Sequence, residues 1–124
     1  MLKKYFYVST KQDKYMREFW PGRVSAIFKK RDILPNELAP GKETVAVRMP
    51  KNEFLIKLIK MIDVPLVSTS LNVAGEEHMT NIKLIDKVFK TKPDLVIDIG
   101  KELKGKPSKL IDVTDINNIK IIRK

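Results

Sequence analysis

Hydroxyl and amide side chains gather in one short stretch of the sequence, Ser68-Thr69-Ser70-Leu71-Asn72. An apolar run precedes it and predicts a strand over residues 66–70. In an extended chain Ser68, Ser70 and Asn72 project to the same side, at the carboxyl end of that strand. Open α/β sheets bind their ligands at this end of their strands. The alternative is a turn in which these side chains bind local backbone groups.

Arg48 ends another predicted strand, residues 44–48, and could reach the same edge of the sheet. Its planar guanidinium suits bidentate recognition of a phosphate or a carboxylate. An exposed ion pair with a neighbouring Glu is the other interpretation.

A lysine-rich segment at residues 100–108, Gly-Lys-Glu-Leu-Lys-Gly-Lys-Pro-Ser, matches the first seven positions of a P-loop and then departs from it. Pro107 stands where a Ser or Thr should bind Mg²⁺, and the residues that follow are typical of a strand, not of a helix. We therefore reject the P-loop. The segment is either an anion-binding turn or a solvated loop, and its polar side chains are Lys101, Lys104, Lys106 and Ser108.

The composition excludes several classes of chemistry. The chain has 124 residues, no cysteine and a single histidine, His78, which rules out disulfides, thiolate sites, a His-based metal cluster and a Ser-His-Asp triad. Its net charge of +10 favours a polyanionic partner, although lysine-rich surfaces also accompany growth at high temperature. We see no signal peptide and no apolar run of membrane-spanning length, so we expect a cytoplasmic protein with no membrane partner.

Strands alternate with helices along the chain, which predicts an α/β fold: one domain over residues 1–124, with helices packed on a twisted mixed sheet that is in part parallel. A loop is expected at 29–42. Helices are expected after a Thr10 cap with Asp13 three residues on, after an Asn52 cap and up to Pro65, and after a Thr80 cap. The expected strands are residues 5–8, 24–28, 44–48, 66–70, 95–99, 110–113 and 119–122.

Five strings, in this order and spread over nearly the whole chain, resemble the YrdC-type threonylcarbamoyl-adenylate synthase family. They are Phe19-Trp20-Pro21-Gly22, Val45-Ala46-Val47-Arg48-Met49-Pro50, Pro65-Leu66-Val67-Ser68-Thr69-Ser70-Leu71-Asn72-Val73-Ala74-Gly75, Pro107-Ser108 and Ile122-Arg123. The resemblance implies a YrdC-like fold and formation of threonylcarbamoyl-AMP and pyrophosphate from ATP, threonine and bicarbonate. It also implies a transferase partner that loads the product onto tRNA.

The same resemblance implies the site residues. Ser70 and Asn72 stand at the family's Ser-x-Asn motif, which meets the ATP phosphates and Mg²⁺, and Arg48 stands at its VAVR arginine. We expect Ser70, Asn72 and Arg48 to be catalytic, and Ser70 and Asn72 to hold the metal ion. The residues expected to bind the nucleotide are Ser68, Ser70, Asn72, Ser108 and Arg123.

Two departures from the family pattern stand out. Lys109 replaces the threonine of the usual Pro-Ser-Thr triplet, and either contacts a phosphate or points to solvent. The family also carries further residues at the front, including a Lys-x-Arg phosphate motif. We expect this chain to lack that portion, which a second chain could supply. The sequence Lys29-Lys30-Arg31 also fits a Lys-x-Arg pattern. It follows the strand predicted after Trp20-Pro21-Gly22, where the family has no such motif, so we do not assign it that role.

Two other functions stay open at this point. One is a non-catalytic YrdC-like module that binds tRNA or double-stranded RNA through its lysines, although the sequence lacks the aromatic clusters of proteins that stack single-stranded bases. The other is an incomplete remnant of the enzyme, marked by an exposed apolar sheet edge. Free carbamate, in place of threonine, also stays open as the co-substrate.

Overall fold

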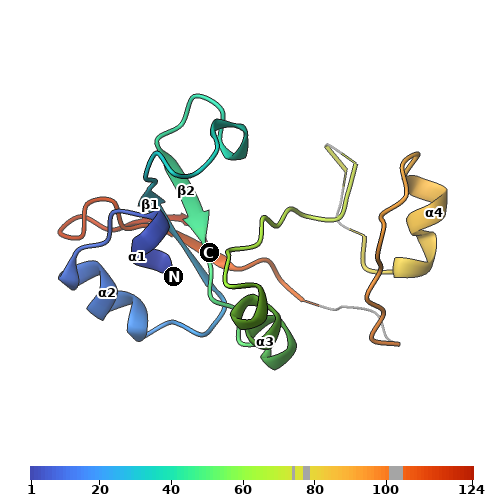
Figure 1. Cartoon of the computed structure of the whole chain (residues 1–124), viewed down its shortest axis with the longest axis horizontal. Coiled ribbons are helices and arrows are strands. Elements are labelled where there is room, and N and C mark those ends of the chain that lie inside the picture. The colour runs from blue at the N-terminus through green and yellow to red at the C-terminus, as the bar shows by residue number, and fades with distance from the viewer. Residues whose placement is uncertain (74, 77–78, 101–104) are drawn as a thin grey trace. The chain divides into compact units, whose positions relative to one another are not determined.

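The computed structural model describes residues 1–73, 75–76, 79–100 and 105–124 (Figure 1). They form two compact units: Met1–Val67 together with Pro107–Lys124, and Ser68–Lys106. Among the described residues, no helix is both long enough and apolar enough to cross a membrane.

The first unit is built on a mixed four-stranded sheet in the order β2-β1-β3-β4. Its strands are β1 (Val24–Lys29), β2 (Thr44–Val47), β3 (Lys109–Asp112) and β4 (Lys120–Arg123). β1 pairs antiparallel with β2 and parallel with β3, and β3 pairs antiparallel with β4. The predicted mixed, partly parallel sheet is therefore confirmed, and these four strands lie within one residue of their predicted bounds at each end.

The hydrophobic core lies on one face of this sheet because side chains alternate along each strand. In β1, Ala26 and Phe28 are fully buried, and Ile111 and Val113 are their counterparts at β3. The Phe28 ring lies 6.3 Å from the Phe6 ring and 6.0 Å from the Trp20 ring, measured between centroids. The complete set of buried apolar residues is Tyr5, Phe6, Met16, Ala26, Phe28, Leu34, Ile111 and Val113.

Helix α2 (Thr10–Arg17) begins with a capping box, but one residue earlier than the sequence predicted. Ser9 is the N-cap: its Oγ accepts a hydrogen bond from the Gln12 backbone N–H, and Gln12 Oε1 accepts one from the Ser9 N–H. The Thr10 and Asp13 pair has the same spacing, yet the longer Gln12 side chain reaches back to the cap more easily. Asp13 instead accepts a hydrogen bond from Arg17, which lowers the pKa of the Asp13 carboxyl.

The strand predicted at residues 5–8 is wrong. Residues Leu2–Tyr5 form a short helix, α1, and only Phe6 makes an isolated antiparallel bridge, to Lys30. Tyr7 follows, and its N–H donates to the Lys29 carbonyl oxygen at 3.0 Å. Aromatic composition alone predicted a strand here, but the two ends of this run are held by a helical turn and by the α2 cap.

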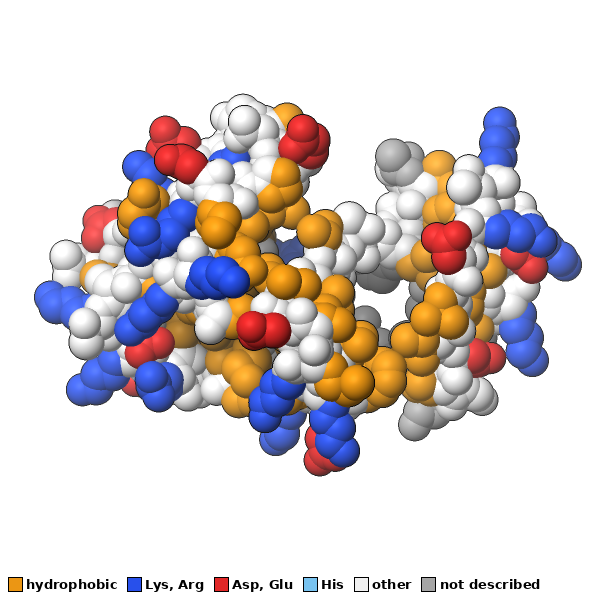
Figure 2. Space-filling view, in the orientation of Figure 1, with side chains coloured by type: hydrophobic (Ala, Val, Ile, Leu, Met, Phe, Trp, Pro, Cys, Tyr) orange, Lys and Arg blue, Asp and Glu red, His pale blue; other side chains and the backbone are white. Residues whose placement is uncertain are grey.

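Helix α3 (Glu53–Ile62) begins at the predicted Asn52 cap, whose Oδ1 accepts from the Leu55 N–H. It ends at Ile62, before the predicted stop at Pro65, because Asp63 takes a left-handed conformation that closes the helix. Apolar side chains are open to solvent over this helix (Figure 2), and Phe54 and Met61 are exposed. A short 3₁₀ helix, η1 (Asn36–Leu38), lies in the predicted loop at 29–42.

The second unit contains η2 (Ile82–Leu84) and α4 (Ile85–Val88), capped by Asn81 rather than by the predicted Thr80. The predicted strands at 66–70 and 95–99 are wrong, since the residues of both segments belong to no strand. An apolar composition favours a strand, but a strand also needs a neighbour to pair with its backbone groups. Leu66, Val67, Leu95 and Ile97 are accordingly exposed.

Gln12 joins α2 to the end of β3 and offers a test of this packing. Its buried Nε2 donates to the Val113 carbonyl oxygen at 2.6 Å. We expect Gln12→Ala to lower the free energy of unfolding by about 1–3 kcal/mol, since a buried carbonyl loses its partner and the helix loses half of its capping box. Urea unfolding measures the change. Lys14→Ala, at an exposed position of the same helix, is the control, and a Gln12→Ala protein as stable as that control contradicts the packing described.

Candidate functional site

Ser108 and Arg123, both predicted to contact the nucleotide, come together at one end of the sheet. Ser108 immediately precedes β3, and the register Val24↔Lys109 sets it beside the start of β1. Its side chain is buried, and its Oγ lies 2.8 Å from Ser25 Oγ on β1. Either hydroxyl can donate in this pair.

The guanidinium of Arg123, the last residue of β4, binds the backbone carbonyl of Ser108. Its Nε and Nη2 donate to the Ser108 carbonyl oxygen at 3.0 and 2.9 Å. Nη2 also lies 3.5 Å from Ser108 Oγ. The residue is exposed, and this carbonyl accepts two of the five guanidinium N–H groups, so the guanidinium keeps further donors.

Arg48 lies at the same end of the sheet. It directly follows β2, and the register Ala26↔Val47 brings it alongside Ser25 of β1. Beyond it, the Gly22 N–H donates to the Met49 carbonyl oxygen at 2.8 Å, which holds the two chain segments together outside the strands. Arg48 is exposed and the described residues give it no ion pair, so the predicted alternative of a pair with a Glu is not found.

Two arginines and two hydroxyls therefore share one sheet end: Arg48, Arg123, Ser25 and Ser108. For the parallel pair β1 and β3 it is the amino end. Sequence reasoning missed Ser25, although a lone hydroxyl between Val24 and Ala26 in an apolar strand was a usable signal. A Cβ at Gly22 would collide with the Phe19 carbonyl oxygen, so the turn that leads into this end of β1 requires glycine.

Ser68, Ser70 and Asn72 belong to the second unit. Ser68 and Ser70 are exposed, and Asn72 is partly buried in a bend. Next to it, the Met79 N–H donates to the Leu71 carbonyl oxygen at 2.8 Å. Asn72 Nδ2 donates to the carbonyl oxygens of Val73 and Glu76 at 2.9 and 3.1 Å. The predicted alternative, in which these side chains bind local backbone groups, is therefore found for Asn72 Nδ2.

The amide oxygen of Asn72 differs from the nitrogen in its hydrogen bonding. Its Oδ1 is buried and accepts no hydrogen bond from any described residue. A shielded amide oxygen is a suitable ligand for a hard cation such as Mg²⁺, which commonly takes one or two protein oxygens together with phosphates and water. In the part of the chain that the structure describes, no cluster of three His, Cys, Asp or Glu offers an all-protein metal site.

The lysine-rich segment is described only in part. Lys101 and Lys104, like His78, lie outside the described residues. Lys106 is exposed, and Lys109, which departs from the family triplet, is exposed at the start of β3. Ser108, in contrast to these exposed lysines, is buried and contacts Ser25 and Arg123.

Comparisons with known proteins agree with the resemblance seen in the sequence. The Sua5/YciO/YrdC family model, described as "Telomere recombination", matches residues 1–124. A threonylcarbamoyl-AMP synthase of Pyrococcus abyssi is 33% identical over 99 residues, which are 80% of this chain and 29% of that protein. A Methanocaldococcus jannaschii protein, named provisionally for the same activity, is 38% identical over 120 residues, 97% of this chain and 56% of that protein.

Solved structures show the same fold. The crystal structure of Escherichia coli YciO matches with a TM-score of 0.82 and 28% identity, over 98% of this chain and 59% of that one. A variant of P. abyssi Sua5 matches with a TM-score of 0.80 and 29% identity, over 94% and 35% of the two chains. The chain thus spans little more than half, or less, of the length of these relatives.

The contact between Arg123 and Ser108 yields a prediction. We expect Arg123→Met to lower the free energy of unfolding by about 1–2 kcal/mol, because the Ser108 carbonyl loses two charge-assisted hydrogen bonds. Arg123→Lys keeps the charge and one donor and should recover part of the loss. Urea unfolding of the three proteins measures this. Equal stability of the Met variant and the parent would contradict the role of Arg123 in holding this end of β3.

Proposed function

The chain belongs to the Sua5/YciO/YrdC family, and from that premise we propose that it binds ATP in the formation of threonylcarbamoyl-AMP and pyrophosphate from ATP, threonine and bicarbonate. The names of the P. abyssi and M. jannaschii relatives support this reaction. The structural observation that carries the proposal is the joint position of Arg48, Ser108 and Arg123 at one end of the sheet.

Arg48 and Arg123 are the proposed triphosphate ligands of the first unit. Both arginines are exposed residues, and Arg123 is fixed in orientation by two of its own hydrogen bonds. A guanidinium held in this way loses less side-chain entropy when it binds a phosphate, and its planar fork suits two phosphate oxygens. Ser108 positions Arg123 and lies against Ser25, so we assign it a positioning role beside the nucleotide.

Ser70 and Asn72 are the proposed ligands of Mg²⁺ and of the phosphates in the second unit, with Ser68 as a further nucleotide contact. The shielded Oδ1 of Asn72 supports a metal-ligand role, while Nδ2 holds the turn in shape. When bound, Mg²⁺ would neutralise phosphate charge and help pyrophosphate to leave.

The proposed chemistry needs no strong general base. The threonine amine and bicarbonate give a carbamate and water. A carbamate oxygen then attacks the α-phosphorus, a new O–P bond forms, and the bond to the bridging oxygen of the β-phosphate breaks, releasing pyrophosphate. Positioning of the two anions and neutralisation of their charge therefore set the rate, which is what arginine, hydroxyl and amide groups supply.

The rest of the machinery is part of the same proposal. The chain spans 56% of the M. jannaschii relative and 29% of the P. abyssi relative, so further residues, linked or in a second chain, would complete the substrate pocket. A transferase would pass the threonylcarbamoyl group on to tRNA, in the cytoplasm.

Titration calorimetry with ATP and Mg²⁺ tests the binding step, and pyrophosphate release that depends on threonine and bicarbonate tests the reaction. We expect ATP binding in the micromolar range, weakened about tenfold or more by Ser70→Ala and by Asn72→Ala, because each change removes a ligand of charged groups. Thr69→Ala removes a neighbouring hydroxyl outside the Ser-x-Asn pair and is the matched control.

Two results would reject the proposal. One is ATP affinity weaker than millimolar in the parent chain. The other is an equal loss of affinity in the Thr69→Ala control and the Ser70→Ala variant, which would mean that the segment matters only for folding.

A further inference from the structure

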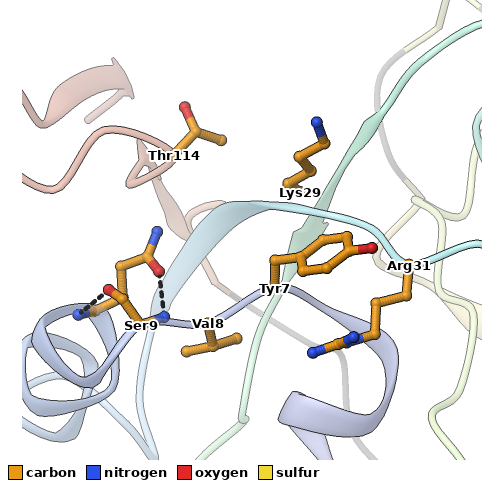
Figure 3. Close-up of a pocket in the computed structure, with 7 residues that line it drawn as sticks. Tyr7, Val8, Ser9, Lys29, Arg31 and Thr114 are labelled. Atoms are coloured by element: carbon orange, nitrogen blue, oxygen red, sulfur yellow. Dashed lines mark hydrogen bonds between the residues drawn. The ribbon is translucent and has the colours of Figure 1, made fainter.

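A hollow with a volume of about 410 Å³ lies at the end of the sheet opposite to Arg48, Ser108 and Arg123 (Figure 3). Lys29 is the last residue of β1, and Thr114 lies two residues beyond the end of β3. Because β1 and β3 run parallel, the hollow lies at their carboxyl ends, where α/β sheets commonly bind ligands, and Ser108 and Arg123 lie at the opposite end. Its lining residues are Tyr7, Val8, Ser9, Gln12, Lys29, Arg31 and Thr114.

The walls of this hollow are held by the fold. Gln12 is buried and binds both the Ser9 N–H and the Val113 carbonyl oxygen, so it ties the start of α2 to the end of β3. The Tyr7 N–H donates to the Lys29 carbonyl oxygen at 3.0 Å. Three separate segments, residues 7–12, 29–31 and 114, are thus held together before any ligand arrives, which reduces the entropy lost on binding.

Tyr7 and Arg31 form a stacked pair on one wall. The guanidinium carbon of Arg31 lies 4.4 Å from the centre of the Tyr7 ring, and Arg31 Nε donates to the Phe6 carbonyl oxygen at 3.3 Å. Tyr7 is nevertheless 48% exposed. Since Arg31 covers one face of the ring, the accessible area lies on the other face and on the edge, and Lys29 extends on the opposite side of the ring from the Arg31 guanidinium in Figure 3.

The polar groups around the ring suit a phosphate and a sugar. Ser9 Oγ accepts from the Gln12 N–H, which leaves its own hydrogen free to be donated to a phosphate oxygen. Thr114 Oγ1 donates to Asp112 Oδ1 and can still accept from a sugar hydroxyl. Lys29 Nζ lies 3.2 Å from Glu43 Oε2, but both side chains are largely exposed, so this pair is weak and a phosphate can displace it.

We propose that this hollow binds one nucleotide, with its base stacked on the open face of Tyr7 and its phosphate beside Lys29 and Ser9. An aromatic ring backed by a cation is a stacking platform for any base, and a lysine at its rim supplies the charge that a phosphate needs. The net charge of +10 favours a nucleotide within an RNA strand over a free one. The site is separate from the proposed triphosphate ligands and does not depend on the proposed function.

The probes are AMP and a single-stranded RNA of about ten nucleotides, each titrated against the full chain by fluorescence anisotropy or calorimetry. We expect Tyr7→Ala to weaken binding about fivefold or more, since it removes one stacking partner, and Tyr7→Phe to keep it. Glu43→Gln should tighten binding about two- to threefold, because it frees Lys29 and removes a repelling carboxylate. Lys57→Met, which removes one charge from exposed α3, is the control.

Tight RNA binding that responds to Tyr7 assigns the site to a nucleotide within a strand, and a response with AMP alone assigns it to a free nucleotide. Both results support the proposal, and in both Tyr7→Ala should leave pyrophosphate release unchanged. It is overturned if neither probe binds, if Tyr7→Ala binds as the parent does, or if Lys57→Met weakens binding as much as Tyr7→Ala, because charge alone would then account for the affinity.

Discussion

The parallel pairing of β1 with β3 is the contact on which the first unit depends. It joins Val24 to Lys109 and Ile27 to Asp112, across more than eighty intervening residues by their numbering. Without it the Ser25 and Ser108 hydroxyls would not meet, and Gln12 would have no Val113 carbonyl to bind. Both candidate sites of this unit are consequences of the pair, one at each end of the two strands. The loop closure that the pair imposes costs entropy, which the buried side chains of Ala26, Phe28, Ile111 and Val113 offset.

The two ends of the sheet have different chemical characters. At the amino end of β1 and β3, two arginines lie near the hydroxyls of Ser25 and Ser108, and one of these arginines is already anchored to a backbone carbonyl. This arrangement favours a highly charged anion. At the carboxyl end a tyrosine ring stacks on an arginine and a lysine stands at the rim, so a planar group and a single phosphate are better matched. The two proposed binding positions therefore lie at opposite ends of the sheet, and a change at one end need not disturb the other.

Much of the sheet could be predicted from the sequence, because β1 to β4 are short apolar or alternating runs with turn residues on either side. The runs at 66–70 and 95–99 have the same composition yet form no strand, since composition does not report whether a partner lies alongside. Family motifs pointed to Arg48, Ser108 and Arg123, and the structure groups these three. Ser25 could have been suspected from its place between Val24 and Ala26. The Tyr7 hollow could not, because its residues come from distant segments and each of them is ordinary by itself.

The central claim is the proposal that Arg48 and Arg123 of the first unit bind the triphosphate. A crystal structure of the chain with a non-hydrolysable ATP analogue and Mg²⁺ tests it most directly. The account predicts phosphate oxygens within hydrogen-bonding distance of both guanidiniums. A triphosphate bound anywhere else, with Arg48 and Arg123 left in solvent, would contradict it.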